Sequence, residues 1–338
     1  MTANNADTSA PWKELAFAIG HASNYEGATG CTVIRAIKGR FRCAAHLLGR
    51  ASGTRELATA TPTHLADRID AVMLTGGSAY GLDAAAGVMR WMEEHDRGFP
   101  IAGGVVPIVP TAVIFDLAPL GSFKARPTAD MAYAACATAS STNIAEGSVG
   151  AGTGATVGKI AGIANAMKGG VGIGSARGGD VLAAAIVVTN SFGDVRNGKN
   201  DIIAGARSAS GGFADGERLL RAELADKAMG KQDANDSDVA RTNTTIAFVA
   251  VNVSMSKIEL AGLAAATSAA FFRRITPCGT AYDGDVIFAA CPVDGVQAPM
   301  PVVEALAVAA MEQAIERSVQ LAQGRDGIPG LADKNAHS

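Results

Sequence analysis

The sequence predicts a layered α/β sandwich. Three observations lead to this class: short apolar segments with strand character, longer segments with helical periodicity, and a predominance of small apolar residues. The 338 residues are 48% hydrophobic and include 40 glycines, yet only 5% are aromatic. Sheets and helices made of small residues can approach closely, and each must bury its apolar face against another layer. The chain is long enough to enclose a large core.

Strands and helices alternate in the first 200 residues. The strand candidates are apolar segments with strand character, at 30–37, 42–48, 69–75, 111–117 and 180–195. Helical periodicity predicts a helix from about Ser78 to His95, after a glycine turn, and a second helix within 126–140. A glycine-rich segment, 147–162, separates this helix from the next strand.

The composition changes between residues 200 and 242, where charged and small polar residues predominate. This segment predicts a partly helical surface excursion with an exposed or disordered end. Residues 245–252 are rich in isoleucine, phenylalanine and valine, as expected for a buried strand. A Ser-x-x-Glu capping box at 256–259 then predicts a helix that reaches about Arg274. A strand at 285–291 and a long amphipathic helix that ends before Gly324 complete the pattern.

We therefore expect one domain, 17–322, with a flexible segment before it (1–16) and a tail after it (323–338). The net charge of −3 gives no basis for binding nucleic acid or an anionic membrane. The N-terminus lacks the regions of a signal peptide, and the apolar runs are too short to cross a bilayer. Five widely spaced cysteines without a Cys-x-x-Cys pair indicate a reducing compartment. These features predict a soluble, cytoplasmic protein without a metal centre.

Thr244 stands where the polar segment meets the apolar strand. A threonine hydroxyl is a weak nucleophile that needs a nearby base. The first residue of a chain carries such a base, because its α-amine has a pKa near 8. Cleavage of the bond between Asn243 and Thr244 would create that arrangement. Asn-Thr-Thr also suits an ordinary turn-to-strand boundary, so the local pattern alone leaves both interpretations open.

Five segments in a fixed order resemble the P1 family of peptidases, also called the DmpA-like or β-aminopeptidase family. They are TGGSAYGLDAAAGVM, AVIFDL, GATVGKI, NTTIAFVAVNVSMSKIEL and RRITPCGTAYDGDVIFA. The likeness covers about residues 17–322, and the nylon-oligomer (6-aminohexanoate-oligomer) hydrolase branch is the most similar pattern. It implies an αββα sandwich like that of N-terminal-nucleophile hydrolases and of ornithine acetyltransferase. It also implies self-cleavage into subunits 1–243 and 244–338, a tetramer of such αβ units, and no cofactor.

The resemblance assigns roles to particular residues. Thr244 matches the nucleophile, which would attack first Asn243 and later the substrate amide to form an acyl-enzyme. Lys159 matches an active-site lysine that stabilises an oxyanion or keeps the Thr244 amine neutral. Asn190 matches an asparagine that donates to the reacting carbonyl. Asp283 and Asp285 match an acidic pair that orients the nucleophile or shuttles its proton.

Each of these residues also has a plain structural interpretation. Lys159 could be a solvated surface lysine, and the Asp-Gly-Asp sequence could be a type I′ or II turn centred on Gly284. Gly76 and Gly77 either shape the substrate pocket or serve the tight turn alone, and Tyr80 either lines the pocket or packs in the helix.

One position departs from the family pattern. Phe115 stands where the family has tyrosine, so the hydrogen bond of that hydroxyl cannot be carried over to this chain. The rate or the substrate preference can differ as a result.

The sequence thus predicts a self-processing amidohydrolase or aminopeptidase that acts on short peptides or linear oligoamides. It does not separate α-peptide, β-peptide and nylon-type amides. An acyltransferase of the ornithine acetyltransferase type and an unprocessed, non-catalytic homologue are the alternatives. GTGATVGKI is not a phosphate-binding loop, because Thr153 replaces its first glycine and Ile160 follows the lysine. The five histidines lack metal-ligand spacing.

Overall fold

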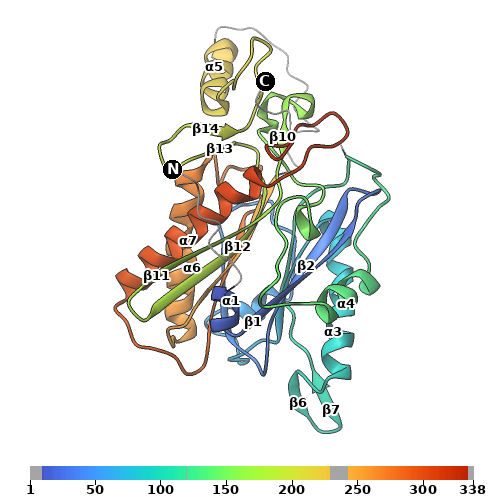
Figure 1. The fold of residues 1–338 in the computed structure, drawn as a ribbon, viewed down its shortest axis with the longest axis vertical. Coiled ribbons are helices and arrows are strands. Elements are labelled where there is room, and N and C mark those ends of the chain that lie inside the picture. Colours follow the sequence, from blue (N-terminus) through green and yellow to red (C-terminus); the bar gives the residue numbers. More distant parts are fainter. Residues whose placement is uncertain (1–9, 119, 229–242, 334–338) are drawn as a thin grey trace.

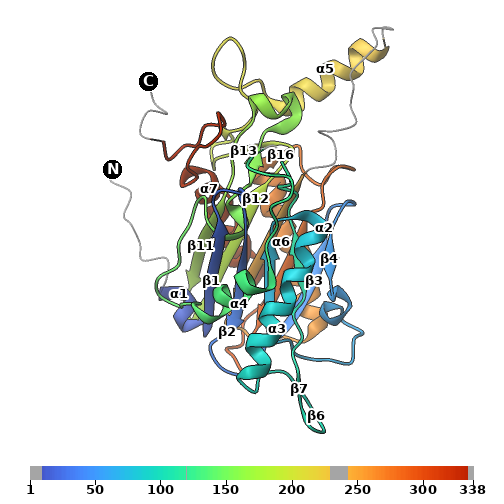
Figure 2. The same cartoon turned by 90° about the vertical axis from the view of Figure 1, so that its right-hand side faces the viewer.

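The computed structural model describes residues 10–118, 120–228 and 243–333. In this part of the chain two five-stranded sheets lie face to face, and helices cover both outer surfaces (Figure 1). In the view turned by 90°, one of the helical layers faces the viewer and the sheets lie behind it (Figure 2). The predicted αββα sandwich is confirmed.

Each sheet contains one parallel pair, and its other neighbouring strands are antiparallel. The strands of the first sheet, in spatial order, are β1 (Phe17–Asn24), β2 (Thr29–Ala36), β5 (Ala71–Thr75), β8 (Thr111–Val113) and β4 (Thr54–Arg55). Those of the second sheet are β11 (Val171–Gly178), β12 (Val181–Asn190), β15 (Thr244–Val251), β17 (Val286–Cys291) and β3 (Arg42–Leu47). The parallel pairs are β5 with β8 and β15 with β17.

Two pairs of helices form the outer layers. Helices α3 (Ala85–Glu94) and α4 (Ala129–Ala137) pack on the first sheet, and α6 (Lys257–Arg274) and α7 (Met300–Gln320) pack on the second. Figure 1 shows these two pairs on opposite sides of the sheets. No helix of the described residues is long and apolar enough to cross a membrane.

Successive side chains of β15 alternate between the two faces of its sheet, so this strand contributes to two hydrophobic cores. Ile246 and Phe248 belong to the core between the sheets, whereas Ala247 and Val249 pack towards α6 and α7. Successive side chains of a strand point to opposite faces, so a strand covered on both faces must be apolar throughout. All eight residues of β15 are buried. The unbroken apolar sequence from Ile246 to Val251 therefore indicates a central strand.

Close approach between layers explains the glycines of β11. A Cβ on Gly172 would lie 2.0 Å from the carbonyl oxygen of Ala314, and one on Gly174 would lie 2.1 Å from that of Ala310. Both contacts are far below normal separations, so α7 can pack this closely on β11 only because the strand carries glycine there.

The remaining elements are short and connect the layers. The other helices are α1 (Ala10–Glu14), α2 (Ser78–Gly81) and α5 (Gly216–Ala228), and the 3₁₀ turns are η1 (Leu57–Ala60), η2 (Leu82–Ala84), η3 (Gly150–Gly152), η4 (Lys159–Ala161) and η5 (Ile163–Asn165). The other strands are β6 (Phe99–Ile101), β7 (Gly104–Val106), β9 (Thr156–Val157), β10 (Met167–Lys168), β13 (Asp194–Arg196), β14 (Ile202–Ala204) and β16 (Ile275–Thr276).

Local signals predicted the elements around the site well. The capping box at Ser256 is present, and α6 ends at Arg274 as expected. The predicted helix from Ser78 forms as α2, η2 and α3 in succession. The predicted strand at 111–117 is too long, because β8 ends at Val113 and the following residues turn away to place a buried aspartate, Asp116. The expected exposed end of the polar excursion, 229–242, lies outside the described residues.

The expected flexible segment 1–16 is wrong for its last residues. Residues 10–14 form α1, and Trp12 is fully buried. Its ring lies 6.4 Å from that of Phe17 and 6.3 Å from that of Phe248, measured between centroids. The segment 1–16 is predicted to be flexible because polar residues predominate in it, but one large side chain, Trp12, anchors its end.

We expect Trp12→Ala to lower the free energy of unfolding by about 3–5 kcal/mol, because it removes the largest side chain of the core between the sheets. The midpoint of chemical denaturation measures this loss. Lys13→Ala, one residue away on the exposed side, is the matched control and should change it by less than about 0.5 kcal/mol. Equal midpoints for the two variants would show that α1 does not contribute to the core.

The expected tail 323–338 is also ordered over most of its length. Both carboxylate oxygens of Asp333 accept backbone N–H groups, from Gly324 and Gly330, at 2.8 Å. Ile328 is buried against the loops at that end of the sandwich, and the carbonyl oxygen of Pro329 accepts the N–H of Lys168 at 2.9 Å. Residues 323–333 are therefore part of the domain.

Candidate active site

Thr244, the predicted nucleophile, is the first residue of β15 and is 5% exposed. Its Oγ donates a hydrogen bond to the carbonyl oxygen of Asn243 at 2.5 Å. The register of the sheet places Asn190, the last residue of β12, directly opposite Thr244. Two predicted site residues that are 54 positions apart in the sequence (244 − 190) thus become cross-strand neighbours.

The carbonyl oxygen of Asn243 has a second donor, the backbone N–H of Gly284, at 3.0 Å. Asn243 and Asp283 form a parallel bridge, which fixes this contact. A Cβ on Gly284 would lie 2.8 Å from Oγ of Thr244 and 2.7 Å from the carbonyl oxygen of Ala51. Gly284 does not have a positive φ, so the turn type considered from the sequence does not explain this glycine. The lack of space beside the hydroxyl of Thr244 explains why residue 284 is glycine.

The acidic pair is buried on either side of Gly284. Oδ1 of Asp285 accepts the N–H of Thr245 at 2.6 Å, and the thiol of Cys278 lies 3.5 Å from Oδ2. Burial and the neighbouring Asp283 raise the pKa of Asp285 to about 7. Asp283 accepts the N–H and the hydroxyl of Thr280 at 2.8 and 2.7 Å. The loop thus presents both carboxylates next to the start of β15.

Lys159 is 2% exposed, so its interpretation as a solvated surface lysine is wrong. Its Nζ donates to Oδ1 of Asn190 at 3.0 Å and to the carbonyl oxygen of the same residue at 3.1 Å. Burial lowers the pKa of Lys159 to about 7, and the carboxylates of Asp283, Asp116 and Asp285 oppose that shift. A lysine with this pKa can exchange a proton near neutral pH.

The amide of Asn190 is fixed from several sides. Its Oδ1 accepts the N–H of Thr156 at 3.0 Å as well as the ammonium of Lys159, and its Nδ2 donates to the carbonyl oxygen of Phe115 at 3.2 Å. Phe115 therefore contributes to the site through its backbone, which is unaffected by the missing tyrosine hydroxyl.

Gly76 and Gly77 lie against Asp116. The N–H of Gly77 donates to Oδ1 of Asp116 at 2.6 Å, and a Cβ on Gly76 would lie 2.1 Å from Oδ2. Burial raises the pKa of Asp116 to about 6. Tyr80 is 58% exposed, so the expected alternative of burial in the helix packing is wrong.

Sequence reasoning missed several buried charged residues, among them Asp116 and Lys168. Lys168 donates to the carbonyl oxygens of Thr153 and Ala155 at 3.0 and 2.7 Å, and burial lowers its pKa to about 7. Each is a single charged residue next to an apolar run, and that was the available signal. This signal is weak because charged surface residues at the ends of buried strands give the same sequence pattern.

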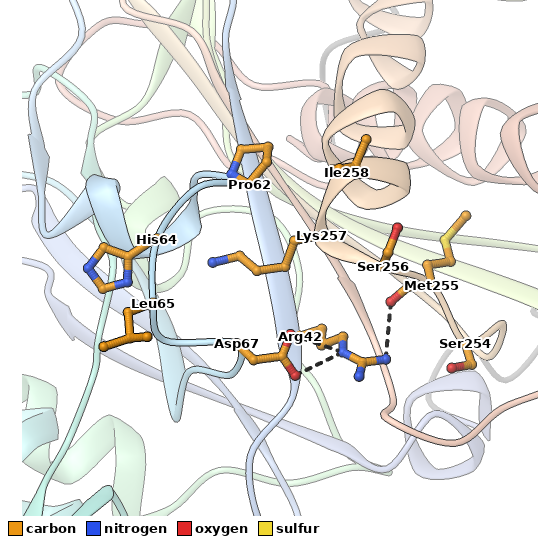
Figure 3. A pocket seen from close by; sticks show the side chains of 10 residues that line it. All are labelled: Arg42, Pro62, His64, Leu65, Asp67, Ser254, Met255, Ser256, Lys257 and Ile258. Carbon is orange, nitrogen blue, oxygen red and sulfur yellow. Dashed lines mark hydrogen bonds and ion pairs between the residues drawn. The ribbon is translucent and has the colours of Figure 1, made fainter.

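A cavity of about 480 Å³ lies at the opposite end of the second sheet, beyond the end of β15. Figure 3 shows it between the loop that carries His64 and Leu65 and the start of α6. The strand spans eight residues, so this cavity is roughly 25 Å from Thr244. Its size alone does not make it the active site.

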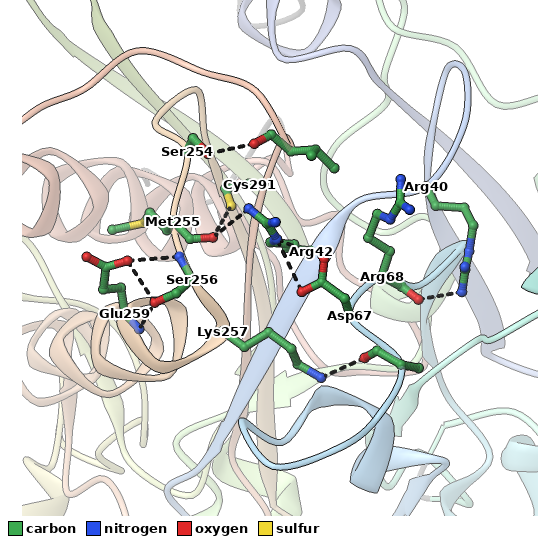
Figure 4. A network of polar contacts seen from close by, with 12 residues as sticks. Arg40, Arg42, Asp67, Arg68, Ser254, Met255, Ser256, Lys257, Glu259 and Cys291 are labelled. Atoms are coloured by element: carbon green, nitrogen blue, oxygen red, sulfur yellow. Dashed lines mark hydrogen bonds and ion pairs between the residues drawn. The ribbon is translucent and has the colours of Figure 1, made fainter.

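A polar network ties the cavity walls together (Figure 4). Arg42 donates to Asp67 at 3.0 Å and to the carbonyl oxygen of Met255 at 3.3 Å. Lys257 donates to the carbonyl oxygens of Thr59 and Ala66 at 2.8 and 2.9 Å. These bonds attach the loop to α6, which is a structural role. Among the described residues no cluster of histidine, cysteine and acidic side chains is arranged to hold a metal ion.

Comparison with known proteins identifies the family. An uncharacterized aminopeptidase of Mycobacterium leprae is 40% identical over 71% of this chain, and the match spans 65% of that protein, a little under two thirds of its length. A 6-aminohexanoate-oligomer endohydrolase of Paenarthrobacter ureafaciens is 32% identical over 80% of this chain and 71% of its own length. The mycobacterial protein is thus the more similar of the two, and the expected proximity to the nylon-oligomer branch is not supported.

The solved structure of the L-aminopeptidase D-Ala-esterase/amidase of Ochrobactrum anthropi, a variant of the N-terminal-nucleophile hydrolase fold, superimposes with a TM-score of 0.68. The match covers 97% of this chain and 91% of that one at 17% identity, which shows a common fold. Residues 16–331 match the profile of peptidase family S58, a family of hydrolases that act on peptide and amide bonds. The chain belongs to peptidase family S58.

Proposed function

We propose that the protein is a self-processing N-terminal-nucleophile amidohydrolase. Cleavage between Asn243 and Thr244 divides its single domain into an α subunit, 1–243, and a β subunit, 244–338. One observation carries the proposal: the carbonyl oxygen of Asn243 lies 2.5 Å from Oγ of Thr244 and 3.0 Å from the N–H of Gly284. The hydroxyl, the carbonyl and a donor for its oxygen are therefore in place before cleavage.

Self-cleavage begins when Oγ of Thr244 attacks the carbonyl carbon of Asn243. Negative charge develops on the carbonyl oxygen, and the N–H of Gly284 stabilises it; one such donor contributes about 3 kcal/mol. The C–N bond then breaks, and the proton of the hydroxyl passes to the departing amine. Water hydrolyses the resulting ester, which leaves a carboxylate on Asn243 and a free amine on Thr244.

The mature enzyme repeats this chemistry on a substrate amide. The new amine of Thr244 accepts the proton of its own hydroxyl as Oγ attacks, and an acyl-enzyme forms. The N–H of Gly284 and the amide of Asn190 bind the oxyanion, which lies where the Asn243 oxygen lay. Lys159 supplies positive charge through its bond to Asn190, and Asp285 holds the backbone of β15 by its bond to Thr245.

Short peptides and linear oligoamides with a free amino end are the proposed substrates. The names of the relatives, an aminopeptidase and an oligomer endohydrolase, support this class. The tetramer of αβ units remains a prediction that rests on the family resemblance.

Intact-mass measurement and N-terminal sequencing of the purified protein test the proposal. Two chains, one of which begins at Thr244, are expected. A well-folded preparation that hydrolyses amides with residues 243 and 244 still joined would exclude the mechanism. Incubation with an acyl donor and an amine acceptor should give more hydrolysis than transfer; the reverse would favour the acyltransferase.

The dependence of kcat/KM on pH should be a narrow bell with its maximum near pH 7. The rising limb reflects ionisation of Asp285, whose pKa is raised to about 7, and loss of the proton from the Thr244 amine. The falling limb reflects loss of positive charge from Lys159 as the pH rises through its pKa of about 7. Rates measured between about pH 5 and pH 9 show both limbs.

Lys159→Met is the diagnostic variant for this profile. It should be slower at all pH values and should lack the falling limb, because no charge remains to be lost. A falling limb that persists unchanged in this variant would assign it to another group.

A further inference from the structure

We propose that Arg126, stacked against Tyr80 and Phe123, binds the free carboxylate at the far end of the substrate. This inference rests on the proposed function, because it specifies which amides the proposed active site hydrolyses. These are short peptides or linear oligoamides that end in a carboxylate.

The guanidinium group of Arg126 is held by aromatic faces. Its Cζ lies 3.8 Å from the ring centroid of Tyr80 and 5.8 Å from that of Phe123. The two rings are 58% and 55% exposed, so they do not contribute to a core. Stacking of this kind restrains the plane of a guanidinium group and leaves the donors at its edge available.

Arg126 has no acceptor among the described residues. No hydrogen bond or ion pair connects it to the described part of the chain, and its Nε is buried without an acceptor. Asp130, four residues further on, is engaged by Arg90 at 2.9 Å. A buried donor that lacks an acceptor costs free energy, and a bound carboxylate offers two oxygens to the fork of donors on an arginine.

Direct contacts place this arginine at the active-site end of the molecule. The residue after it, Pro127, packs on Gly77 so closely that a Cβ on the glycine would lie 2.8 Å from Cδ of the proline. Gly77 in turn donates its N–H to Asp116. Figure 2 shows α2, which carries Tyr80, at the end of the sandwich where β13 and β16 lie.

The same contacts continue to the nucleophile. Asp116 follows Phe115, whose carbonyl oxygen accepts from Asn190, and Asn190 lies opposite Thr244 in the sheet. A substrate whose amide reaches Thr244 can therefore extend past this loop towards Arg126. The charge of a carboxylate, and its two equivalent oxygens, distinguish it there from a neutral carboxamide.

The test compares one short peptide in two forms, with a free carboxylate and as the carboxamide. The native enzyme should prefer the acid about tenfold to a hundredfold in kcat/KM, as expected for hydrogen bonds to a charged group. Arg126→Gln should lose this preference through a higher KM for the acid, while its rate on the carboxamide stays within about twofold of native. Arg126→Lys should keep part of the preference, because lysine retains the positive charge but lacks the planar guanidinium group that stacks on Tyr80 and donates two parallel hydrogen bonds.

Two controls separate recognition from structure. Arg126→Gln should still be cleaved before Thr244, as intact mass will show. Arg90→Gln, which removes a nearby arginine that is already paired, should leave the ratio of acid to carboxamide rates unchanged.

Equal rates of the native enzyme on the two forms would overturn the inference, as would an equal loss of both rates in Arg126→Gln. If the native protein hydrolyses neither form and stays uncut, the proposed function fails. Calorimetric titration of native protein and Arg126→Gln with the two peptides then decides the inference independently.

Discussion

Thr244→Ala should yield a single uncut chain without amide hydrolase activity. The substitution removes the attacking oxygen for self-cleavage, and without cleavage the α-amine that would serve as the base does not exist. Loss of a nucleophile typically lowers kcat by about 10⁴-fold or more, so residual hydrolysis should lie near the background. Intact mass measures the processing, and release of amine from a short peptide measures the activity.

Thr244→Ser is the matched control, because serine keeps both the hydroxyl and, after cleavage, the amine. It should process and turn over, at reduced rates. Both variants should unfold at nearly the same denaturant concentration as the native protein, since Thr244→Ser removes only a methyl group and Thr244→Ala only a methyl and a hydroxyl. Cleaved and active Thr244→Ala protein would show that another residue is the nucleophile.

Gly284→Ala should slow both self-cleavage and substrate hydrolysis by about 10²–10³-fold. A Cβ at this position would lie 2.8 Å from Oγ of Thr244 and 2.7 Å from the carbonyl oxygen of Ala51, so the loop or the nucleophile must move. Displacing the loop also displaces the N–H that the scissile carbonyl accepts, and loss of one oxyanion donor has an effect of this size. Time courses of chain cleavage after expression, together with kcat, measure the two effects.

Gly262→Ala offers the control for a glycine-to-alanine change. Gly262 lies in α6 with nothing within 4 Å of a Cβ, so activity should be unchanged and stability should rise by up to about 1 kcal/mol. If Gly284→Ala is processed at the native rate, the loop can shift without slowing cleavage, and its N–H is not required for the reaction.

Local sequence was sufficient for the central elements. The run from Ile246 to Val251 is apolar at every position, which indicates a strand covered on both faces, and the structure places it in the middle of a sheet. Ser256 and Glu259 are sufficient to start α6, because a capping box is made within one turn. Both signals rest on contacts between residues that are close in the chain.

The site was predictable in part for a different reason. Ordered motifs that resemble a family predict Thr244, Lys159 and the acidic pair, whereas no local pattern distinguishes Lys159 from a surface lysine. The structure brings Lys159 into contact with Asn190 and places Asn190 opposite Thr244. Trp12 illustrates the opposite case: the polar composition of its segment predicts a flexible chain, whereas the buried aromatic side chain anchors that segment to the core.

The layered class, the strand that begins at Thr244 and the helix that follows it can be inferred from local patterns, because periodicity and capping depend on near neighbours. Other properties are seen only in the folded molecule: the N–H of Gly284 meets the carbonyl of Asn243, Asp116 and Lys168 are buried, and Arg126 has no acceptor among the described residues. These properties arise from register and packing between segments far apart in the chain, and burial of a charge is a property of its surroundings that its own neighbours in sequence do not encode.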